Sequence, residues 1–412
     1  MDGIRLKYEP LKGVYIKGVI GKQRYFMSSG SGVVRGLDLE FSLADMFDSL
    51  FTKANIIIGG GMISKYQSDQ DPIYKLPENV AAFAGRLNLI TGKFNIGAEY
   101  AYKINDPSAA NSYIYKDGES FLFTASYSTK GLGILLTAKR VDNMDFRSDR
   151  TASGSSLNIN YIPAISKVHT YSLAAYYPYA TQPNGEMGIQ GDIIYKIKRG
   201  SALGGKYGTS ISINYSNIFG IKRSAVNDTT AVGESGTLGY KSNFFEIGET
   251  KYFEDFNINM SRRFTKKFKA AVSFMYFEYN KDVIQGFGNK YGTIYGNVGV
   301  ADLTLKLKPK NSIRVELQHL YTEQDAGNWL MMLAEYTLAP HWFVAAFDEY
   351  NYGNEKSEKR FHYFTAQVGY KNKGNTFTLG YGRQRAGIFC VGGVCRNVPA
   401  SNGITLAITS SF

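Results

Sequence analysis

The sequence of 412 residues contains no stretch of about 18 consecutive apolar residues, so it offers no candidate for a transmembrane helix. Cysteine and histidine are scarce, at two and four residues, and they form no cluster with the spacing of a metal site. Proline is also rare, whereas tyrosine (31), phenylalanine (26) and glycine (44) are abundant. This composition, without long helical patterns, indicates an all-β protein. We expect no metal and no cofactor.

The formal net charge is +12, which makes a nucleic acid the first partner to consider. The basic residues, however, are spread along the whole chain with acidic residues among them, and they form no stripe or tail. We therefore expect no nucleic-acid partner. Attraction to anionic lipid headgroups or to anionic solutes is a better explanation of the positive charge.

Alternation of apolar and polar side chains recurs along the sequence. In residues 94–103, Phe94 and Ile96 fall on one parity, whereas Asn95 and Glu99 fall on the other. A strand turns successive side chains to opposite faces, so each such stretch has one apolar and one polar face. We count about 20 strands, in a range of about 18–22, besides a short one at residues 3–9. The expected strands are residues 14–27, 34–45, 55–66, 79–90, 94–103, 119–129, 132–142, 155–162, 168–177, 186–198, 207–218, 250–264, 268–279, 292–308, 311–322, 326–338, 342–352, 360–371, 375–385 and 403–412.

The connections between the expected strands alternate in length. Short turns with basic residues, proline or glycine, such as 91–93 and 339–341, alternate with longer polar loops, such as 67–78 and 219–249. Outer-membrane barrels have short periplasmic turns and longer extracellular loops, whereas a soluble β-sandwich has no reason to sort its loops in this way. We therefore predict a transmembrane antiparallel up-and-down β-barrel that comprises residues 1–412 as a single domain.

Such a barrel must close, because hydrocarbon offers no partner to backbone N–H and C=O groups and only a closed sheet leaves no edge. The apolar parity would then face lipid and the polar parity would face the lumen. Tyrosines near the strand ends on the apolar parity fit the headgroup level of a membrane. They are Tyr102, Tyr127, Tyr161, Tyr177, Tyr195, Tyr215, Tyr336, Tyr370 and Tyr381.

The chain ends in an amphipathic stretch, residues 403–412, with Ile404, Leu406 and Phe412 on one parity. This ending resembles the last strand of bacterial outer-membrane β-barrels, and the resemblance makes Phe412 part of the signal for membrane insertion. A soluble edge strand is the alternative for this stretch taken alone. No signal peptide precedes the strand pattern that begins at residue 3, although an outer-membrane protein needs one. We therefore expect the sequence to lack its signal peptide and further N-terminal strands.

Two stretches resemble an uncharacterised family of outer-membrane β-barrels from the Bacteroidota. The first is the block of residues 2–47, which contains Gly21-Lys22-Gln23-Arg24 and Gly32-Val33-Val34-Arg35-Gly36. The second is Gly382-Arg383-Gln384-Arg385-Ala386-Gly387, followed by the segment from Cys390 to Cys395. The resemblance implies a porin-like barrel in the outer membrane of a Gram-negative bacterium. It implies no activity.

Charged side chains of both signs fall on the polar parity and are the candidate pore-lining residues. A barrel of this size is too wide to be filled by side chains alone, so it must hold water, infolded loops or a plug. The loop at residues 219–249 is the best candidate to fold inward. The pore-lining candidates are Asp38, Glu40, Arg86, Glu99, Asp192, Lys196, Lys198, Arg263, Lys269, Arg314, Glu316, Glu335 and Asp348.

The sequence points to no catalytic group. His169, His319 and His362 fall on the apolar parity near strand ends, and His341 lies in a turn. None of them shares the polar face with a serine and an acid in a way that suggests a nucleophile with its base. We therefore expect that the chain is not an enzyme, and a lipid-modifying enzyme is only a third, weaker class.

Two features lie near the extracellular end of the last strands. Cys390 and Cys395 have the spacing of neither a zinc ribbon nor a CxxC redox motif, so we expect a disulfide within a loop, with two buried free thiols as the alternative. Arg383 and Arg385 take the apolar parity, where they either bind lipopolysaccharide phosphates or lie on a solvated rim.

These features predict an outer-membrane barrel that lets small polar solutes diffuse, or pass selectively, through a charged lumen. Its partners would be outer-membrane lipid, lipopolysaccharide and the solutes. The alternative is a non-conducting barrel that serves as a subunit or scaffold of a secretion, assembly or nutrient-uptake complex, with other envelope proteins as partners.

Overall fold

The computed structural model describes residues 1–47, 53–152, 156–391 and 394–411. The chain is all-β: nineteen strands belong to one antiparallel sheet, and β19 (Gly387–Val391) and β20 (Val394–Val398) form a separate hairpin. The helices in the described ranges have one turn or little more, namely α1 (Leu43–Met46), α2 (Lys281–Gln285), η1 (Ala109–Asn111) and η2 (Ser357–Lys359). None of these helices has the length and apolar character needed to cross a membrane.

The strands pair mainly with their neighbours in the chain. Pairing in chain order joins β1 (Asp2–Leu11), β2 (Val14–Tyr25), β3 (Ser28–Ser42), β4 (Ala54–Tyr66), β5 (Asn79–Thr91), β6 (Phe94–Lys103), β7 (Gly118–Thr129) and β8 (Leu132–Asp142). The next two strands, β9 (Glu186–Ile197) and β10 (Thr209–Ile221), also pair with each other. A second consecutive set is β11 (Ile247–Arg263), β12 (Phe268–Asn280), β13 (Thr293–Lys308), β14 (Asn311–Tyr321), β15 (Trp329–Leu338), β16 (Trp342–Tyr350), β17 (His362–Asn372), β18 (Asn375–Gln384) and β21 (Ser401–Ser410).

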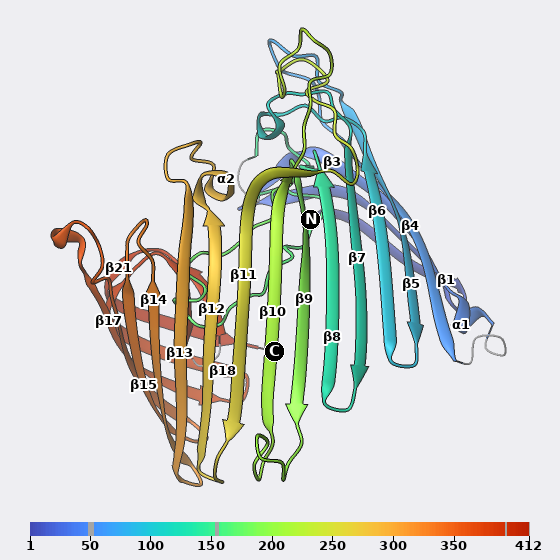
Figure 1. Cartoon of the computed structure of the whole chain (residues 1–412). Helices are drawn as coiled ribbons and strands as arrows, with labels where there is room; N and C mark the ends of the chain where they lie inside the picture. Colours follow the sequence, from blue (N-terminus) through green and yellow to red (C-terminus); the bar gives the residue numbers. More distant parts are fainter. Residues whose placement is uncertain (48–52, 153–155, 392–393, 412) are drawn as a thin grey trace. The chain divides into compact units, whose positions relative to one another are not determined.

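Glycines allow several of the tight turns. Gly13, Gly92 and Gly131 have φ of 84°, 53° and 85°, in the left-handed region, and they lie between β1 and β2, β5 and β6, and β7 and β8. Glycine adopts this conformation without the steric cost of a Cβ, so short connections form between long strands. Figure 1 shows β5 to β8 side by side, with such turns at one end.

The chain divides into two compact units. Unit 1 comprises Met1–Ile165, Ala180–Gly191 and Asn217–Lys251. Unit 2 comprises Ser166–Tyr179, Asp192–Ser216 and Tyr252–Phe412. That the chain is a single domain therefore stays a prediction.

In unit 1, the two faces of the sheet differ in the way the sequence predicts. One face, here called the apolar face, exposes large side chains such as Leu37, Met62 and Phe83. The opposite face, here called the polar face, carries charged side chains, and Lys65 and Lys103 on it are completely buried. A soluble protein would bury the apolar residues and expose the lysines. This inverted distribution suits a sheet whose apolar face is covered by lipid.

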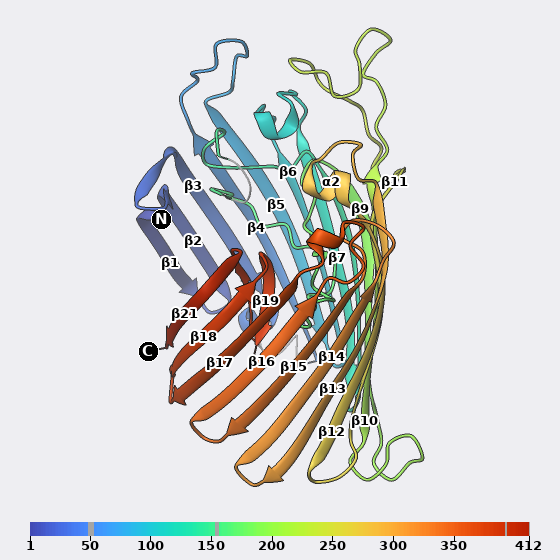
Figure 2. The same ribbon diagram turned by 90° about the vertical axis from the view of Figure 1, so that its left-hand side faces the viewer.

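Unit 2 has the same two faces. Figure 2 shows β12 to β18 as successive strands, followed by β21. Leu317, Met332 and Leu379 are exposed on the apolar face, whereas Gln318 and Glu316 are buried on the polar face. The alternation along each strand therefore separates apolar from polar side chains, as predicted for a membrane-spanning sheet.

Two of the expected strands are absent. Residues 156–185 contain no strand, so the predictions of strands at 155–162 and 168–177 are wrong. The connection between β8 and β9 is instead a single long segment, residues 143–185, of which 153–155 lie outside the described residues. Tyr161 and Tyr177, expected at a membrane interface, belong to this segment, and Tyr177 is buried.

The other connections largely follow the predicted alternation of short and long. Two residues join β5 to β6, β7 to β8 and β17 to β18. The long connections are residues 104–117 between β6 and β7, 222–246 between β10 and β11, and 351–361 between β16 and β17. The loop expected at 386–402 contains the β19–β20 hairpin. The consecutive pairings give β1 a partner in β2 and β21 a partner in β18, and closure into a barrel stays a prediction.

Candidate functional site

An arginine of β5 links two carboxylates of β3. The Arg86 guanidinium lies 2.5 Å from Asp38 (Nη1 to Oδ1) and 2.8 Å from Glu40 (Nη2 to Oε2). Lys17 of β2 donates a hydrogen bond of 3.4 Å to Asp38. The four side chains carry two positive and two negative charges, so they form a balanced network of charge-assisted hydrogen bonds on the polar face. Three of the predicted pore-lining residues are thus brought together.

This network depends on glycines of β4, the strand between β3 and β5. Gly59 is the register partner of both Glu40 and Arg86. A Cβ at Gly59 would lie 2.5 Å from the guanidinium carbon of Arg86, and a Cβ at Gly61 would lie 3.2 Å from Asp38. Glycine at position 59 therefore lets the arginine side chain cross β4 and reach the strand beyond it. Alternation alone did not reveal this role, although the three consecutive glycines opposite charged strands were a visible signal in the sequence.

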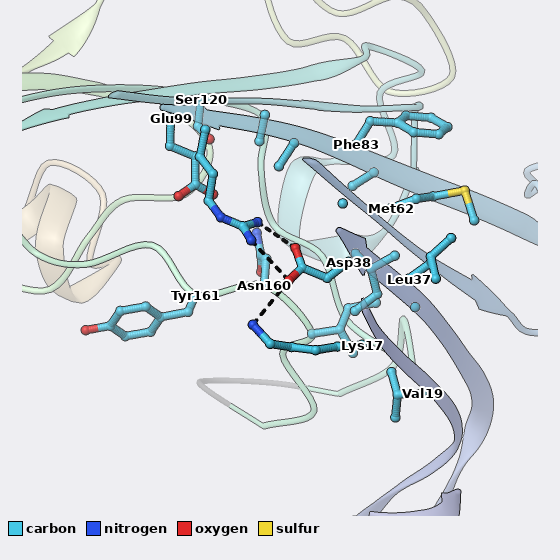
Figure 3. A pocket seen from close by; sticks show the side chains of 18 of the residues that line it. Lys17, Val19, Leu37, Asp38, Met62, Phe83, Glu99, Ser120, Asn160 and Tyr161 are labelled. Atoms are coloured by element: carbon cyan, nitrogen blue, oxygen red, sulfur yellow. Dashed lines mark hydrogen bonds and ion pairs between the residues drawn. The ribbon is translucent and has the colours of Figure 1, made fainter. Parts of the chain in front are cut away.

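A cavity of about 440 Å³ borders the network in unit 1. One wall is formed by residues of the sheet, among them Lys17, Asp38 and Glu99, and the other by residues 144 and 159–162 of the segment after β8. Figure 3 shows Lys17 joined to Asp38, whereas Glu99 has no hydrogen bond or ion pair with the side chains drawn. The cavity thus combines a balanced ionic network with one further carboxylate, Glu99, and one further guanidinium, that of Arg5 on β1.

The unit 1 part of the 143–185 segment is held on the polar face by buried charges. Lys65 Nζ lies 2.5 Å from Asp106 Oδ2, and Arg150 Nε lies 2.9 Å from Asp106 Oδ1. Lys103 Nζ donates a hydrogen bond of 2.7 Å to the backbone carbonyl of Asp145. Buried charges are tolerated only when they are paired in this way. This part of the segment is therefore fixed to the sheet at several points.

An apolar contact supports the same attachment. Phe146 is completely buried and packs with Val80 and Ala82 of β5, and Ile63 and Ile159 lie at the edge of this cluster. The ammonium groups of both buried lysines lie within 6 Å of the Phe146 ring centre, at 5.7 and 5.9 Å, where they interact with its π face. The segment thus covers a region of the polar face whose own side chains are apolar.

In unit 2, residues 166–179 also pack on the polar face. The Leu173 N–H donates a hydrogen bond of 2.9 Å to Gln318, and the Tyr177 hydroxyl donates one of 3.0 Å to Asp325. The Tyr176 ring lies 5.2 Å from that of Trp329. The strands contribute buried apolar side chains to this contact. The sequence signal for the contact is the apolar run Leu173-Ala174-Ala175-Tyr176-Tyr177, which interrupts the alternation of apolar and polar residues.

Unit 2 contains a second arginine network. The Arg314 guanidinium bonds Asp302 through two contacts of 3.1 Å, and it also pairs with Glu316. Arg314 is the register partner of Glu335 on β15. Arg314, Glu316 and Glu335 were predicted to line the lumen, and the structure places them together. The hydroxyl of Tyr171, in the 143–185 segment that covers the polar face (the covering segment), donates a hydrogen bond of 3.5 Å to Asp302.

A family model matches the whole chain, residues 1–412, with the description "family of unknown function (DUF6029)". The chain belongs to this family. No curated protein matches it. The predicted membership of an uncharacterised family is therefore confirmed, whereas an origin in the Bacteroidota stays a prediction.

Solved structures with some similarity are mutants of the porin from Rhodopseudomonas blastica. A mutant with five substitutions is 12% identical, with a TM-score of 0.32, and the match covers 87% of this chain and 100% of the porin. A triple mutant is 12% identical, with a TM-score of 0.31, and the match covers 86% of this chain and 98% of the porin. Similarity at this level carries no argument about function, and the assignment of the fold depends on the strand pairings described above.

Other pore-lining candidates in unit 2 belong to β9, β11 and β12 or follow them, and not to the strands of the Arg314 network. Asp192 accepts a hydrogen bond of 2.8 Å from an asparagine of β10. Lys196 has the same parity as Asp192, Lys198 follows the end of β9, and both lysines are exposed. Arg263 and Lys269 are register partners beside the β11–β12 turn.

Asp348 departs from its predicted place. It has the parity of the exposed Val344 and lies 2.7 Å from His362 Nδ1, so it belongs to the apolar face near the end of β16. The neighbouring Glu349 takes the polar face, where it is buried and bonds Arg385 Nε at 2.6 Å. Arg385 therefore does not take the predicted apolar parity. Both parities of β16 are mainly apolar, so its alternation did not determine which face was which.

The predicted place of His169 is also wrong, because this residue is not in a strand. Its Nε2 lies 2.6 Å from Asp255 Oδ2, a buried carboxylate of β11. Lys167 donates a hydrogen bond of 2.6 Å to Asn257 on the same strand. These contacts attach the 166–179 part of the long segment to the polar face of unit 2.

The loop at 219–249 does not take the inward path that we predicted. Ser242 and Tyr240 donate hydrogen bonds of 2.5 and 2.6 Å to Asp142, which has the parity of the exposed Leu136. The loop also pairs with the connection after β6, through the Tyr115 N–H and the backbone carbonyl of residue 237. The segment that covers the polar face is 143–185 instead.

Two predictions concern side chains outside the described residues. One is the role of Phe412 in the insertion signal, and the other is the disulfide between Cys390 and Cys395. The backbone positions of the two cysteines face each other in the β19–β20 hairpin. Within the part of the chain that is described, no group of three or more histidine, cysteine, aspartate and glutamate side chains has the arrangement of a metal site.

Proposed function

We propose that the chain forms a porin-like channel in the outer membrane of a Gram-negative bacterium and admits small polar solutes, without catalysis. One observation carries the proposal: charged side chains of both signs gather on the face of the sheet opposite the exposed apolar side chains. When such a sheet closes, hydrocarbon contacts the apolar face, and the charges face an enclosed space that contains water. Outer-membrane lipid and lipopolysaccharide would then contact the apolar face.

The charge networks indicate how the channel would select among ions. Arg86 balances Asp38 and Glu40, so Arg86→Gln leaves these carboxylates without their shared cation. We expect the variant to be more selective for cations than the unchanged protein. The reversal potential of the purified chain in planar bilayers, measured under a KCl gradient, gives this selectivity directly. The control is Arg360→Gln, an exposed residue of the β16–β17 connection, which should leave the reversal potential unchanged.

A non-conducting scaffold is the second candidate, because the 143–185 segment covers apolar parts of the polar face in each unit. Such a barrel would bind other envelope proteins rather than pass solutes. Steady, water-filled conductance steps support the channel. An inserted chain that stays silent in planar bilayers would contradict the channel and favour the scaffold.

A further inference from the structure

The charge of Glu99 is not balanced by its neighbours. Arg86 is its register partner on β5, but the guanidinium is directed across Gly59 to Asp38 and Glu40. Lys17 is the second basic residue of the network, and it too bonds Asp38 rather than Glu99. Within the described structure, the Glu99 carboxylate forms no hydrogen bond or ion pair, and it borders the unit 1 cavity (Figure 3). The cavity therefore offers a carboxylate to an incoming cation.

An aromatic ring borders the same cavity. Tyr161 comes from the covering segment rather than from the sheet, and it is 88% exposed. The face of an exposed aromatic ring attracts ammonium groups, and the attraction adds to that of a carboxylate. Arg5 also borders the cavity, so the ring and the carboxylate without a partner favour a cation at Glu99 rather than throughout the cavity.

The rest of the wall is largely apolar. Ile63 and Ala82 from the sheet face the cavity, together with Met144, Ile159 and Ile162 from the covering segment. A small inorganic cation would gain nothing from these side chains, whereas an organic amine would bury its hydrocarbon part against them. The volume of about 440 Å³ lies within the usual range for small-molecule sites.

We propose that this cavity binds solutes that carry one protonated amine on a small apolar body, with Glu99 as the group that bonds the amine and Tyr161 as the ring beside it. The inference deepens the proposed function, on which it rests, by naming a class of solute. Arg86 and Lys17 take part indirectly, because their pairing with Asp38 leaves Glu99 available.

Binding of 2-phenylethylamine to the detergent-solubilised full chain tests this proposal by calorimetry. The neutral 2-phenylethanol and the anionic phenylacetate have the same ring and chain, so they isolate the contribution of the charge. Hydrogen bonds to a charged group are strong enough that the amine should bind about tenfold more tightly than the alcohol. Equal binding of amine and alcohol would overturn the proposal.

Variants locate the site. Glu99→Gln, which keeps the size of the side chain, should weaken amine binding by about tenfold, and Glu99→Lys should reverse the preference towards phenylacetate. Tyr161→Ala should weaken amine binding, whereas Tyr161→Phe should preserve it. The control is Glu358→Gln, an exposed residue of η2 that removes the same charge far along the sequence and should change nothing. Unchanged amine binding in both Glu99 variants would refute the assignment.

Binding in detergent does not require conduction, so the two proposals fail separately. A chain that conducts but does not distinguish amine from alcohol contradicts the site and leaves the channel intact. A chain that is silent in bilayers but binds the amine through Glu99 contradicts the channel and supports the site.

Discussion

At the scale of single residues, Arg86 reaches Asp38 and Glu40 because Gly59 leaves room for the guanidinium above β4. Gly59→Ala should displace the guanidinium and leave the two carboxylates without their shared partner. Hydrogen bonds to charged groups contribute roughly 1.5–3 kcal/mol, so we expect the free energy of unfolding to fall by about 1–3 kcal/mol. Denaturant titration of the lipid-embedded chain measures the change.

The neighbouring glycine provides a matched control. A Cβ at Gly60 would approach only the backbone oxygen of Ala84, at 3.6 Å, which is an ordinary contact. Gly60→Ala should therefore cost less than Gly59→Ala. The cost of Gly59→Ala should also shrink in an Arg86→Gln background, because no guanidinium is left to displace. Equal losses from the two glycine substitutions would show that Arg86 does not need this passage.

At the scale of elements, alternation predicted strands well wherever a neighbouring strand was available to pair. The expected ranges 94–103 and 132–142 agree with β6 and β8 to the residue. Residues 168–177 also alternate in part, but Leu173 and Tyr177 are buried against the polar face of unit 2 instead. Alternation is a local property of the sequence. Whether such a stretch pairs as a strand or covers an apolar surface depends on distant residues, so alternation alone could not decide between these two outcomes.

The attachment of the 143–185 segment should depend on pH through Asp149. Burial alone would raise the pKa of this carboxyl group, but hydrogen bonds from Thr151, Ser31 and Gln67 outweigh burial and lower the pKa to about 2. The usual pKa of aspartate is about 3.9, so Asp149 stabilises the attachment fully above about pH 4, and this contribution is lost as the pH falls towards about 2. Hydrogen exchange of residues 143–152, relative to β5 in the same sample, should accelerate over this interval.

Two variants separate Asp149 from other acids. Asp149→Asn has no charge to lose, so the exchange of residues 143–152 relative to β5 should be fast at pH 5 and should change little between pH 4 and pH 2. Asp71→Asn should keep the transition, because the Asp71 carboxylate accepts hydrogen bonds from the backbone of its own loop, at Ile73 and Tyr74. A transition that persists in Asp149→Asn would assign it to another group.

At the scale of the whole molecule, composition and alternation were enough to predict an all-β sheet with one apolar and one polar face. They did not predict which charged residues would pair, because Arg86 crosses a strand and Arg314 bonds both Asp302 on its neighbouring strand and Glu316 on its own. They also misplaced Asp348, because both parities of β16 are mainly apolar. Pairing depends on register and on the space between strands, which alternation does not encode.

The sorting of the two faces itself can be tested with adjacent residues of β17. Val368 is exposed on the apolar face, between its register partners Val344 and Leu379, and Gln367 points to the polar face. An arginine facing lipid near mid-depth costs roughly 2–4 kcal/mol, so Val368→Arg should lower the free energy of unfolding from lipid vesicles by about that amount. Gln367→Arg, one residue away, should cost less because its charge would lie on the polar face rather than in lipid. If the two substitutions cost the same, lipid does not cover the apolar face, and the membrane-spanning assignment is wrong.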